Sequence, residues 1–250
     1  MNPHGRAPSR FPARASLGQP AVTAPAARPV TKPVGLGLDS AAVRQAMVQR
    51  LSGLPDMAPA VLAAMAELPR HAFVDPALAN QAYQDTSLPI GLGQTISKPS
   101  VVARMLSLLL QGRDQPPARV LEIGTGCGYQ AALLAKLGGT VISVERLKGL
   151  HDKARTLVRP LALRNLHLVL ADGTLGYPSY APYDAIIAAA AGTQIPHAWL
   201  EQLAPGGILV APVETGPGRH VLRMVQRTAS GWEQTDLEPV RFVPLKFGVT

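Results

Sequence analysis

Three glycines and two glutamates near the middle of the chain have the types and spacing of a nucleoside-binding site. Gly124, Gly126 and Gly128 follow a short apolar run, where the chain must turn sharply and where a ligand can approach backbone atoms. Glu122 ends that run, and Glu145 ends the next one, about 20 residues past the glycines. A carboxylate at that place can accept hydrogen bonds from both hydroxyls of a ribose.

The spacing of the glycines also indicates which nucleoside is bound. Dinucleotide folds use G-x-G-x-x-G, whereas this loop reads G-x-G-x-G and has Tyr129 at the sixth position. A negative charge on Glu122 suits a cation better than a pyrophosphate. S-adenosyl-L-methionine carries a sulfonium and an ammonium group, so it is the predicted cofactor. The alternative is a tight strand-to-helix turn that binds no ligand.

Two further stretches carry residues that can bind ligands. Asp172 and Gly173 follow an apolar run, and we expect the carboxylate to recognise the exocyclic amine of adenine; a plain Asp-Gly turn is the alternative. Residues 88–100, LPIGLGQTISKPS, read as neither helix nor regular strand. There Ser97 and Pro99 resemble the cap and first turn of a helix over 101–110, and Ser97 at that positive end can also hold an anionic group.

The elements that must position these residues form an α/β pattern. Strands are predicted at 120–123, 140–145, 166–170, 183–189 and 205–213, and helices at 130–137, 147–157 and 197–203. Helices over about 39–51, with Asp39 as N-cap, 57–68 and 77–83 form an N-terminal extension, and 221–226 and 240–245 read as antiparallel strands around a turn near Ser230. The fold class is a doubly wound, mostly parallel sheet.

Composition divides the chain at residue 38. Residues 1–38 hold seven prolines, five basic residues and no acidic residue, so we expect a disordered tail that contributes +5 of the net charge of +8. The remainder, 39–250, is then a domain of charge +3, with 39–100 as helical extension and substrate loop and 101–250 as cofactor-binding core. That charge does not favour nucleic acid as a partner. The single cysteine, Cys127, and the lack of a long apolar run favour a cytoplasmic protein without membrane contact, and we expect a monomer without a metal.

Several pieces of the chain, from about Asp39 onward, resemble the protein-L-isoaspartate O-methyltransferase family in the family's order. They are LPRHAFV (68–74), LPIGLGQTISKP (88–99), VLEIGTGCGYQAALLA (120–135), VERLKGL (144–150), YDAII (183–187), PGGILVAPV (205–213) and VRFVPL (240–245). The resemblance implies a Rossmann-like methyltransferase fold and methyl transfer from S-adenosylmethionine to the α-carboxylate of isoaspartyl residues in damaged proteins and peptides, a repair reaction.

The resemblance also implies roles for individual residues. Ser97 corresponds to the family's active-site serine, with Thr95 beside it. The cofactor residues that carry over are Glu122, Gly124, Gly126, Glu145, Asp172 and Gly173.

The chain departs from the family at AAAAG (188–192) and at Lys98, both beside the expected site. Two alternatives follow: an O-methyltransferase acting on a different carboxylate, or a homologue that binds the cofactor without turnover. Methylation of a nucleic-acid base is disfavoured, because the Asn/Asp-Pro-Pro-aromatic loop typical of amino-group methylation is missing from that position. A carboxylate with a pKa of about 4 is already ionised at neutral pH, so the reaction would need no general base.

Overall fold

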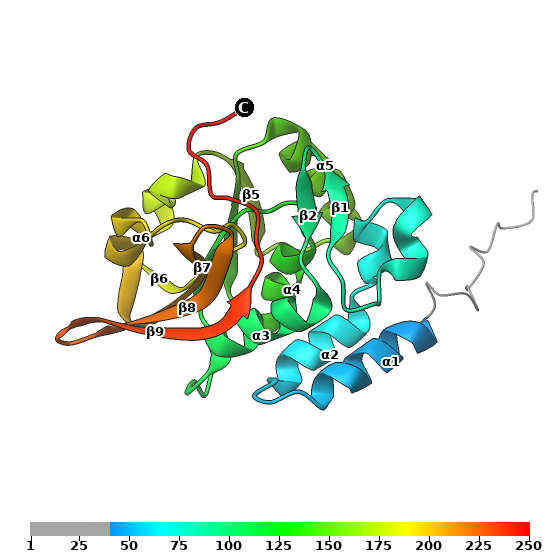
Figure 1. Cartoon of the computed structure of the whole chain (residues 1–250), viewed down its shortest axis with the longest axis horizontal. Coiled ribbons are helices and arrows are strands. Elements are labelled where there is room, and N and C mark those ends of the chain that lie inside the picture. Colours follow the sequence, from blue (N-terminus) through cyan, green and yellow to red (C-terminus); the bar gives the residue numbers. More distant parts are fainter. Residues whose placement is uncertain (1–40) are drawn as a thin grey trace, which may run out of the picture. The chain divides into compact units, whose positions relative to one another are not determined.

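A seven-stranded sheet forms the centre of the described chain, which in this computed structural model comprises residues 41–250 (Figure 1). Its strand order is β5-β4-β3-β6-β7-β8-β9, parallel from β5 to β7 and antiparallel for the last two. A separate antiparallel hairpin pairs β1 with β2. The strands are β1 Leu88–Gly91, β2 Gln94–Ile96, β3 Arg119–Ile123, β4 Thr140–Glu145, β5 Leu166–Leu170, β6 Tyr183–Ala188, β7 Leu203–Gly216, β8 Arg219–Thr228 and β9 Gly231–Val240.

Helices cover both faces of the sheet, because alternate residues of each buried strand point to opposite sides. Val120 packs into the core formed with α2, α3 and α4, whereas Leu121 and Ile123 pack into a second core with α6. The helices are α1 Ala41–Ser52, α2 Pro59–Glu67, α3 Pro99–Leu110, α4 Tyr129–Leu137, α5 Lys148–Val158 and α6 His197–Gln202. The short 3-10 helices are η1 Arg70–Phe73, η2 Pro76–Gln81, η3 Arg159–Leu161, η4 Gly173–Leu175 and η5 Pro178–Tyr180.

The doubly wound, mostly parallel architecture with antiparallel C-terminal strands confirms the predicted fold class. The last strand was placed wrongly: β9 covers 231–240, and residues 241–245 contribute only an isolated parallel bridge between Pro244 and Ala191. Residues 88–96 also differ from the prediction, because they form the β1–β2 hairpin. The predicted cap Asp39 and the predicted tail 1–38 lie outside the described residues.

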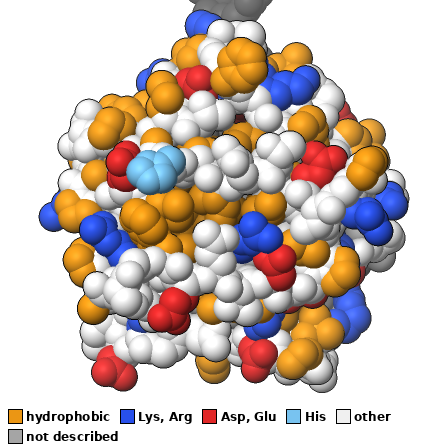
Figure 2. Space-filling model, turned by 60° about the vertical axis from the view of Figure 1, so that its left-hand side comes forward, with side chains coloured by type: hydrophobic (Ala, Val, Ile, Leu, Met, Phe, Trp, Pro, Cys, Tyr) orange, Lys and Arg blue, Asp and Glu red, His pale blue; other side chains and the backbone are white. Residues whose placement is uncertain are grey.

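The surface of the described part carries charges of both signs. Figure 2 shows acidic and basic side chains interspersed around a hydrophobic area on one face. None of the helices within 41–250 is long and apolar enough to cross a membrane.

Candidate active site

The loop between β3 and α4 has the conformation that its glycines allow. Gly124, Gly126 and Gly128 have φ values of +92°, +57° and +87°, in the left-handed region that side chains rarely adopt. At Gly128 a Cβ would also lie 2.8 Å from Cγ1 of Val158, so this glycine is required for close packing of α4 against α5. The loop therefore turns sharply enough to bring backbone groups of 124–126 to the carboxyl end of the sheet.

A cavity of about 70 Å³ lies beside this loop, and we call it the glycine-loop cavity. Four of the predicted cofactor residues line it: Gly124, Gly126, Glu145 and Gly173. Glu122, Gly128 and Asp172 do not. The remaining lining residues include two from the divergent stretch 188–192 and four from the C-terminal end of the chain, namely Ala189, Ala190, Val243, Pro244, Leu245 and Lys246.

Among the described residues, Glu145 presents the one carboxylate in the lining of this cavity. Its Oε2 accepts a hydrogen bond from the Gly126 amide at 2.9 Å, and its Oε1 accepts from the amides of Arg146 and Leu147 at 2.9 and 3.0 Å. A carboxylate offers about four lone-pair sites, so acceptor capacity remains for a ligand hydroxyl. The side chain is only 5% exposed, which makes each of these bonds costly to lose. A carboxylate that is hydrogen-bonded to a glycine loop and keeps a free lone pair is suited to accept a hydrogen bond from a ribose hydroxyl.

Asp172 lies just outside the cavity and is held by the end of the chain. Its Oδ1 accepts from the amide and hydroxyl of Thr174, and its Oδ2 accepts from the Gly248 amide at 2.6 Å. Burial acts to raise the pKa of Asp172, but the bonds from Gly248 and Thr174 outweigh it and hold the pKa below its usual value. Asp172 thus links η4 to the C-terminal end of the chain.

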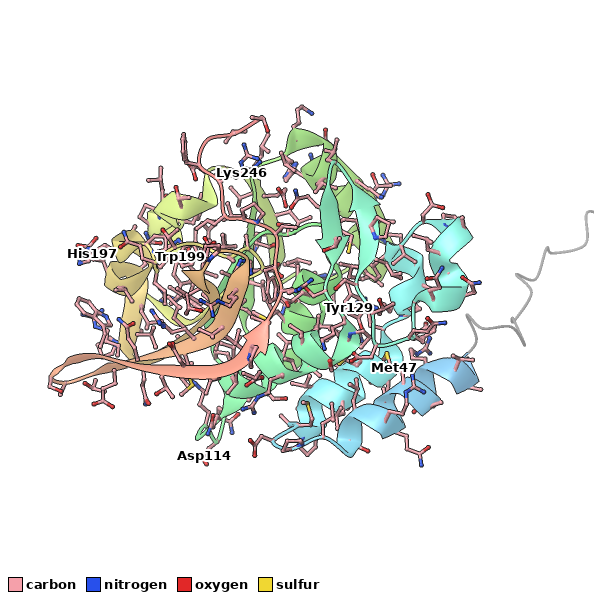
Figure 3. All side chains as sticks on the ribbon, viewed as in Figure 1. Met47, Asp114, Tyr129, His197, Trp199 and Lys246 are labelled. Atoms are coloured by element: carbon pink, nitrogen blue, oxygen red, sulfur yellow. The ribbon has the colours of Figure 1, made fainter. Side chains whose placement is uncertain are left out.

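The C-terminal segment, residues 241–250, covers the cavity (red in Figure 1; Lys246 labelled in Figure 3). It is fixed to the stretch after β6, where Leu245 N donates to Ala191 O at 2.7 Å. It is also fixed beside α5, where Thr250 N donates to Arg146 O at 2.9 Å and Lys148 N donates to Thr250 O at 2.8 Å. Ligand pockets usually measure about 300–1,000 Å³, so part of the lining, of which this segment supplies four residues, must move to admit a nucleoside.

Trp199 supports the part of the cavity wall that Gly173 forms. It is buried on α6, and its Nε1 donates to Gly173 O at 2.8 Å (Figure 3). A Cβ on Gly173 would lie 2.6 Å from Cγ2 of Ile123. The glycine thus lets η4 close onto the end of β3, and the tryptophan holds it there.

Glu122 lies beneath the loop and is fully buried. The Ser143 hydroxyl donates to its Oε2, and Ser143 in turn contacts the Thr125 hydroxyl at 2.6 Å. Burial raises the pKa of Glu122 to about 8, against the lowering effect of the Ser143 hydrogen bond. Burial therefore disfavours the negative charge expected near the loop. What Glu122 contributes is a buried hydrogen-bonded link from β3 through β4 to the loop.

Ser97 lies between two spaces. On one side is an open groove of about 690 Å³, the Ser97 groove, whose lining includes Lys98, Arg219 and Arg241. On the other is a small internal cavity of about 30 Å³ that also borders Gly124 and Ala189, two residues of the glycine-loop cavity. The carboxylate of Asp85 also lines the groove and pairs with Lys98 at 3.8 Å, so a substrate carboxylate there would meet Ser97 and the two arginines.

The structure corrects the predicted cap and separates Thr95 from Ser97. α3 begins at Pro99 with Lys98 as N-cap and without a side-chain cap. Its first turn is instead bound by Asp85, which accepts from the amide and hydroxyl of Ser100, both at 2.8 Å. Thr95 lies on the exposed face of β2 and lines neither the Ser97 groove nor the glycine-loop cavity.

Arg70 supports Ser97 from inside the protein, which the sequence analysis missed. The side chain is fully buried, its Nε donates to Ala82 O and its Nη2 to Ser97 O, both at 2.8 Å. Its guanidinium carbon lies 5.2 Å from the centre of the Tyr129 ring. Burial lowers the pKa of Arg70, and the nearby Tyr129 opposes this shift. Arg70 thus fixes the main chain at Ser97, the residue that borders both the Ser97 groove and the small internal cavity.

Replacing Arg70 with methionine is expected to lower the free energy of unfolding by about 1–3 kcal/mol. Two hydrogen bonds from a charged group are lost, and the relief of burying that charge offsets part of the loss. Urea denaturation measures the effect. Arg50→Met is the matched control, because this exposed arginine also donates to a carbonyl, Tyr83 O at 2.8 Å, and should cost about 0.5 kcal/mol or less. Equal losses in the two variants would contradict the supporting role of Arg70.

Comparisons with known proteins place these features in a family. The family model described as Protein-L-isoaspartate(D-aspartate) O-methyltransferase matches residues 43–249. A protein-L-isoaspartate O-methyltransferase from Methylibium petroleiphilum is 58% identical over 222 residues, covering 87% of this chain and 82% of the relative. One of the same name from Burkholderia pseudomallei is 49% identical over 265 residues, covering 99% and 81%.

Solved structures agree in fold. A protein-L-isoaspartate O-methyltransferase superposes with a TM-score of 0.72 at 27% identity, covering 82% of this chain and 67% of the other. A putative protein-L-isoaspartate O-methyltransferase from Plasmodium falciparum, solved in complex with S-adenosyl-L-homocysteine, superposes with a TM-score of 0.69 at 23% identity, covering 81% and 98%.

Proposed function

This chain belongs to the protein-L-isoaspartate(D-aspartate) O-methyltransferase family, and we infer that it transfers a methyl group from S-adenosylmethionine to the α-carboxylate of L-isoaspartyl residues in damaged proteins and peptides. Relatives at 58% and 49% identity carry the name of that activity. The observation in this chain that supports it best is the position of Ser97, which borders both an open cationic groove and the internal cavity beside the glycine loop.

The residues around the glycine-loop cavity would hold the cofactor. When bound, S-adenosylmethionine supplies an electrophilic methyl group on a sulfonium sulfur. Glu145 would accept hydrogen bonds from the ribose, and Gly124, Gly126 and Gly173 would leave room for its close approach. Asp172 would bind the adenine amine after Gly248 has released it. Glu122 would act indirectly, by keeping the loop in place through Ser143 and Thr125.

The residues around the Ser97 groove would bind and orient the substrate. An α-carboxylate is ionised at neutral pH, so this chain needs to orient an oxygen rather than remove a proton. Arg219 and Arg241 provide positive charge along the groove, where Asp85 offsets Lys98. The Ser97 hydroxyl would donate to the attacking oxygen. Fixing reactants in line can supply roughly 7–11 kcal/mol of the barrier. Thr95 would affect the hairpin rather than the carboxylate.

We propose that the two parts of the chain have different roles. Residues 39–100 would form the substrate-binding cover, with Arg70 linking η1 to Ser97, and 101–250 would form the cofactor-binding core. We also propose that the enzyme acts as a cytoplasmic monomer on proteins and peptides and not on nucleic acids.

A pair of peptides tests the activity. An isoaspartyl peptide presents its α-carboxylate on a backbone one methylene longer than its aspartyl twin, so a groove that binds backbone and carboxylate together can distinguish peptides of equal charge. We expect labelled methyl from S-adenosylmethionine to appear only on the isoaspartyl peptide. Equal labelling of the twins would favour a different carboxylate substrate. Cofactor binding without any labelling would favour an inactive homologue.

Ser97→Ala tests the serine in the same assay. A lost hydrogen bond to a charged group is worth about 1.5–3 kcal/mol, so turnover should fall roughly 10- to 150-fold while cofactor affinity is nearly unchanged. The matched control is Ser230→Ala, in the exposed turn between β8 and β9, which should keep full turnover. An unimpaired Ser97→Ala enzyme would remove the serine from the mechanism.

A further inference from the structure

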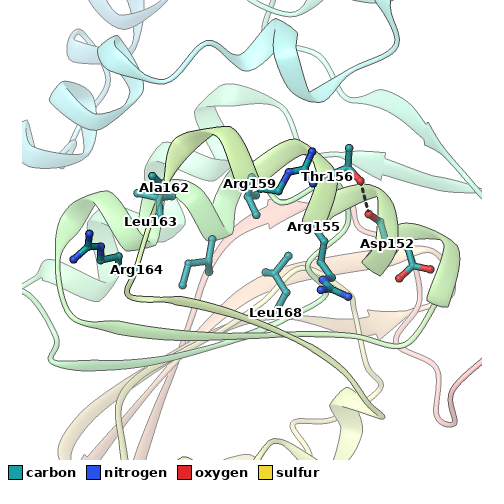
Figure 4. Close-up of a pocket in the computed structure, with 10 residues that line it drawn as sticks. Asp152, Arg155, Thr156, Arg159, Ala162, Leu163, Arg164 and Leu168 are labelled. Atoms are coloured by element: carbon teal, nitrogen blue, oxygen red, sulfur yellow. Dashed lines mark hydrogen bonds between the residues drawn. The ribbon is translucent and has the colours of Figure 1, made fainter.

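A groove on the outer side of α5 carries three arginines that have no partner in the described part of the chain. It lies between α5, η3 and β5 and has a volume of about 660 Å³ (Figure 4). Arg155, Arg159 and Arg164 line it and are exposed, and their guanidinium groups make no hydrogen bond or ion pair within residues 41–250. The one carboxylate in the lining, Asp152, is already paired with Lys148 at 2.5 Å. The groove therefore has a positive rim.

The floor of this groove is aliphatic. Val158, Leu163, Leu166 and Leu168 line it and are only partly buried, so apolar surface is left open to a ligand. Leu166 and Leu168 occupy alternate positions of β5 and therefore point to the same side of the sheet. A ligand that contacts both the arginines of the rim and the aliphatic floor must carry both negative charge and apolar groups.

We propose that this groove binds an extended acidic segment of a partner protein in which acidic and apolar residues alternate. Arg155 and Arg159 are four residues apart along a helical backbone, a rise of about 6 Å. Alternate side chains of an extended chain are separated by roughly 6.6–6.8 Å on each face. Two carboxylates of such a segment are therefore spaced like the backbone positions of the two arginines, whose long, exposed side chains can turn to meet them, while the side chains between them face the leucines.

The position of β5 favours the same ligand. Among the described residues β5 is an edge strand, paired in the sheet only with β4, so the groove lies at the border of the sheet and no further strand blocks an extended segment from entering it. Nucleic acid fits less well, because no aromatic side chain in the described lining can stack on a base. A small anion fits less well too, because it would leave the aliphatic floor exposed and would find no buried polar group to orient it.

Fluorescence anisotropy with a labelled peptide of alternating aspartate and leucine tests this proposal on the full chain. We expect binding that weakens as salt rises from about 0.05 to 0.5 M, because it depends on exposed charges. R155Q/R159Q should weaken binding at least tenfold. R119Q is the control, since Arg119 is an exposed arginine on β3, two strands away from β5. Peptides with serine for leucine, or lysine for aspartate, should bind at least tenfold more weakly.

Three outcomes would overturn the proposal. The first is that the peptide does not bind at all, and the second is that R155Q/R159Q and R119Q lose the same amount of peptide affinity. The third outcome is that inorganic phosphate or a single-stranded oligonucleotide displaces the peptide at matched charge. The variants are first checked by circular dichroism and by methylation of a short isoaspartyl peptide. This groove lies beyond the residues assigned to methyl transfer, so R155Q/R159Q should keep that turnover. Failure of the docking proposal and failure of the proposed function are therefore separate results.

Discussion

Replacing Glu145 with alanine is expected to weaken cofactor binding by about 3 kcal/mol or more, at least 100-fold in Kd. The carboxylate would bind the ribose, and it also accepts amide hydrogen bonds from Gly126, Arg146 and Leu147. The alanine variant therefore loses ligand contacts and at the same time leaves three donors of the cavity wall without their acceptor. Isothermal titration calorimetry with S-adenosylmethionine measures the change.

Glu233→Ala is the matched control, because this glutamate is exposed on β9 and lies outside the cavity lining. It should bind the cofactor as tightly as the natural chain does. Unchanged affinity in a folded Glu145→Ala protein would mean that the nucleoside site has been assigned to the wrong cavity. Glu145→Gln should also bind poorly, because its amide would place a donor against one of the amide donors.

Replacing Glu122 with glutamine is expected to stabilise the protein at high pH and to have little effect near pH 5. The folded-state pKa of Glu122, about 8, lies above that of an unfolded glutamate, about 4.3, so the folded chain binds the extra proton between those values. Stability then falls as pH rises through this window, by several kcal/mol in total, and the loss is complete above about pH 8. Glutamine resembles the protonated acid in shape and does not ionise.

The free energy of unfolding, measured by urea denaturation at pH 5, 7 and 9, checks this expectation. The difference between Glu122→Gln and the natural chain should grow steadily across the series. Glu233→Gln, at an exposed position, should show a difference that does not change with pH. A constant difference for Glu122→Gln as well would show that Glu122 is ionised in the folded protein.

The parts of the site that depend on local sequence could be predicted. The glycine loop and Glu145 belong to one β-α-β unit, in which strand ends and turns follow from residue type and short spacing. Glu122 lies at the predicted strand end, and its complete burial is the feature that the prediction did not include. Its position two residues after Val120 puts both on the face that α4 covers, and this period of two was available in the sequence.

The parts that depend on distant contacts could not be predicted. Residues 241–245 are apolar enough to read as a strand, but β9 uses 231–240, and the following residues return across the sheet to meet Ala191. Arg70 reaches Ser97, 27 residues away, and nothing in the spacing indicates that pair. Asp85 likewise caps α3 from a preceding loop, which removes the capping role expected for Ser97.

The C-terminal segment affects which step of the reaction cycle is the slowest. Because Gly248, Leu245 and Thr250 fasten it over the cavity, we expect each exchange of spent for fresh cofactor to break these bonds and form them again. Methyl transfer needs no such rearrangement once both reactants are bound. Release of the demethylated cofactor would then limit turnover, and the enzyme would complete its first round of catalysis faster than the rounds that follow.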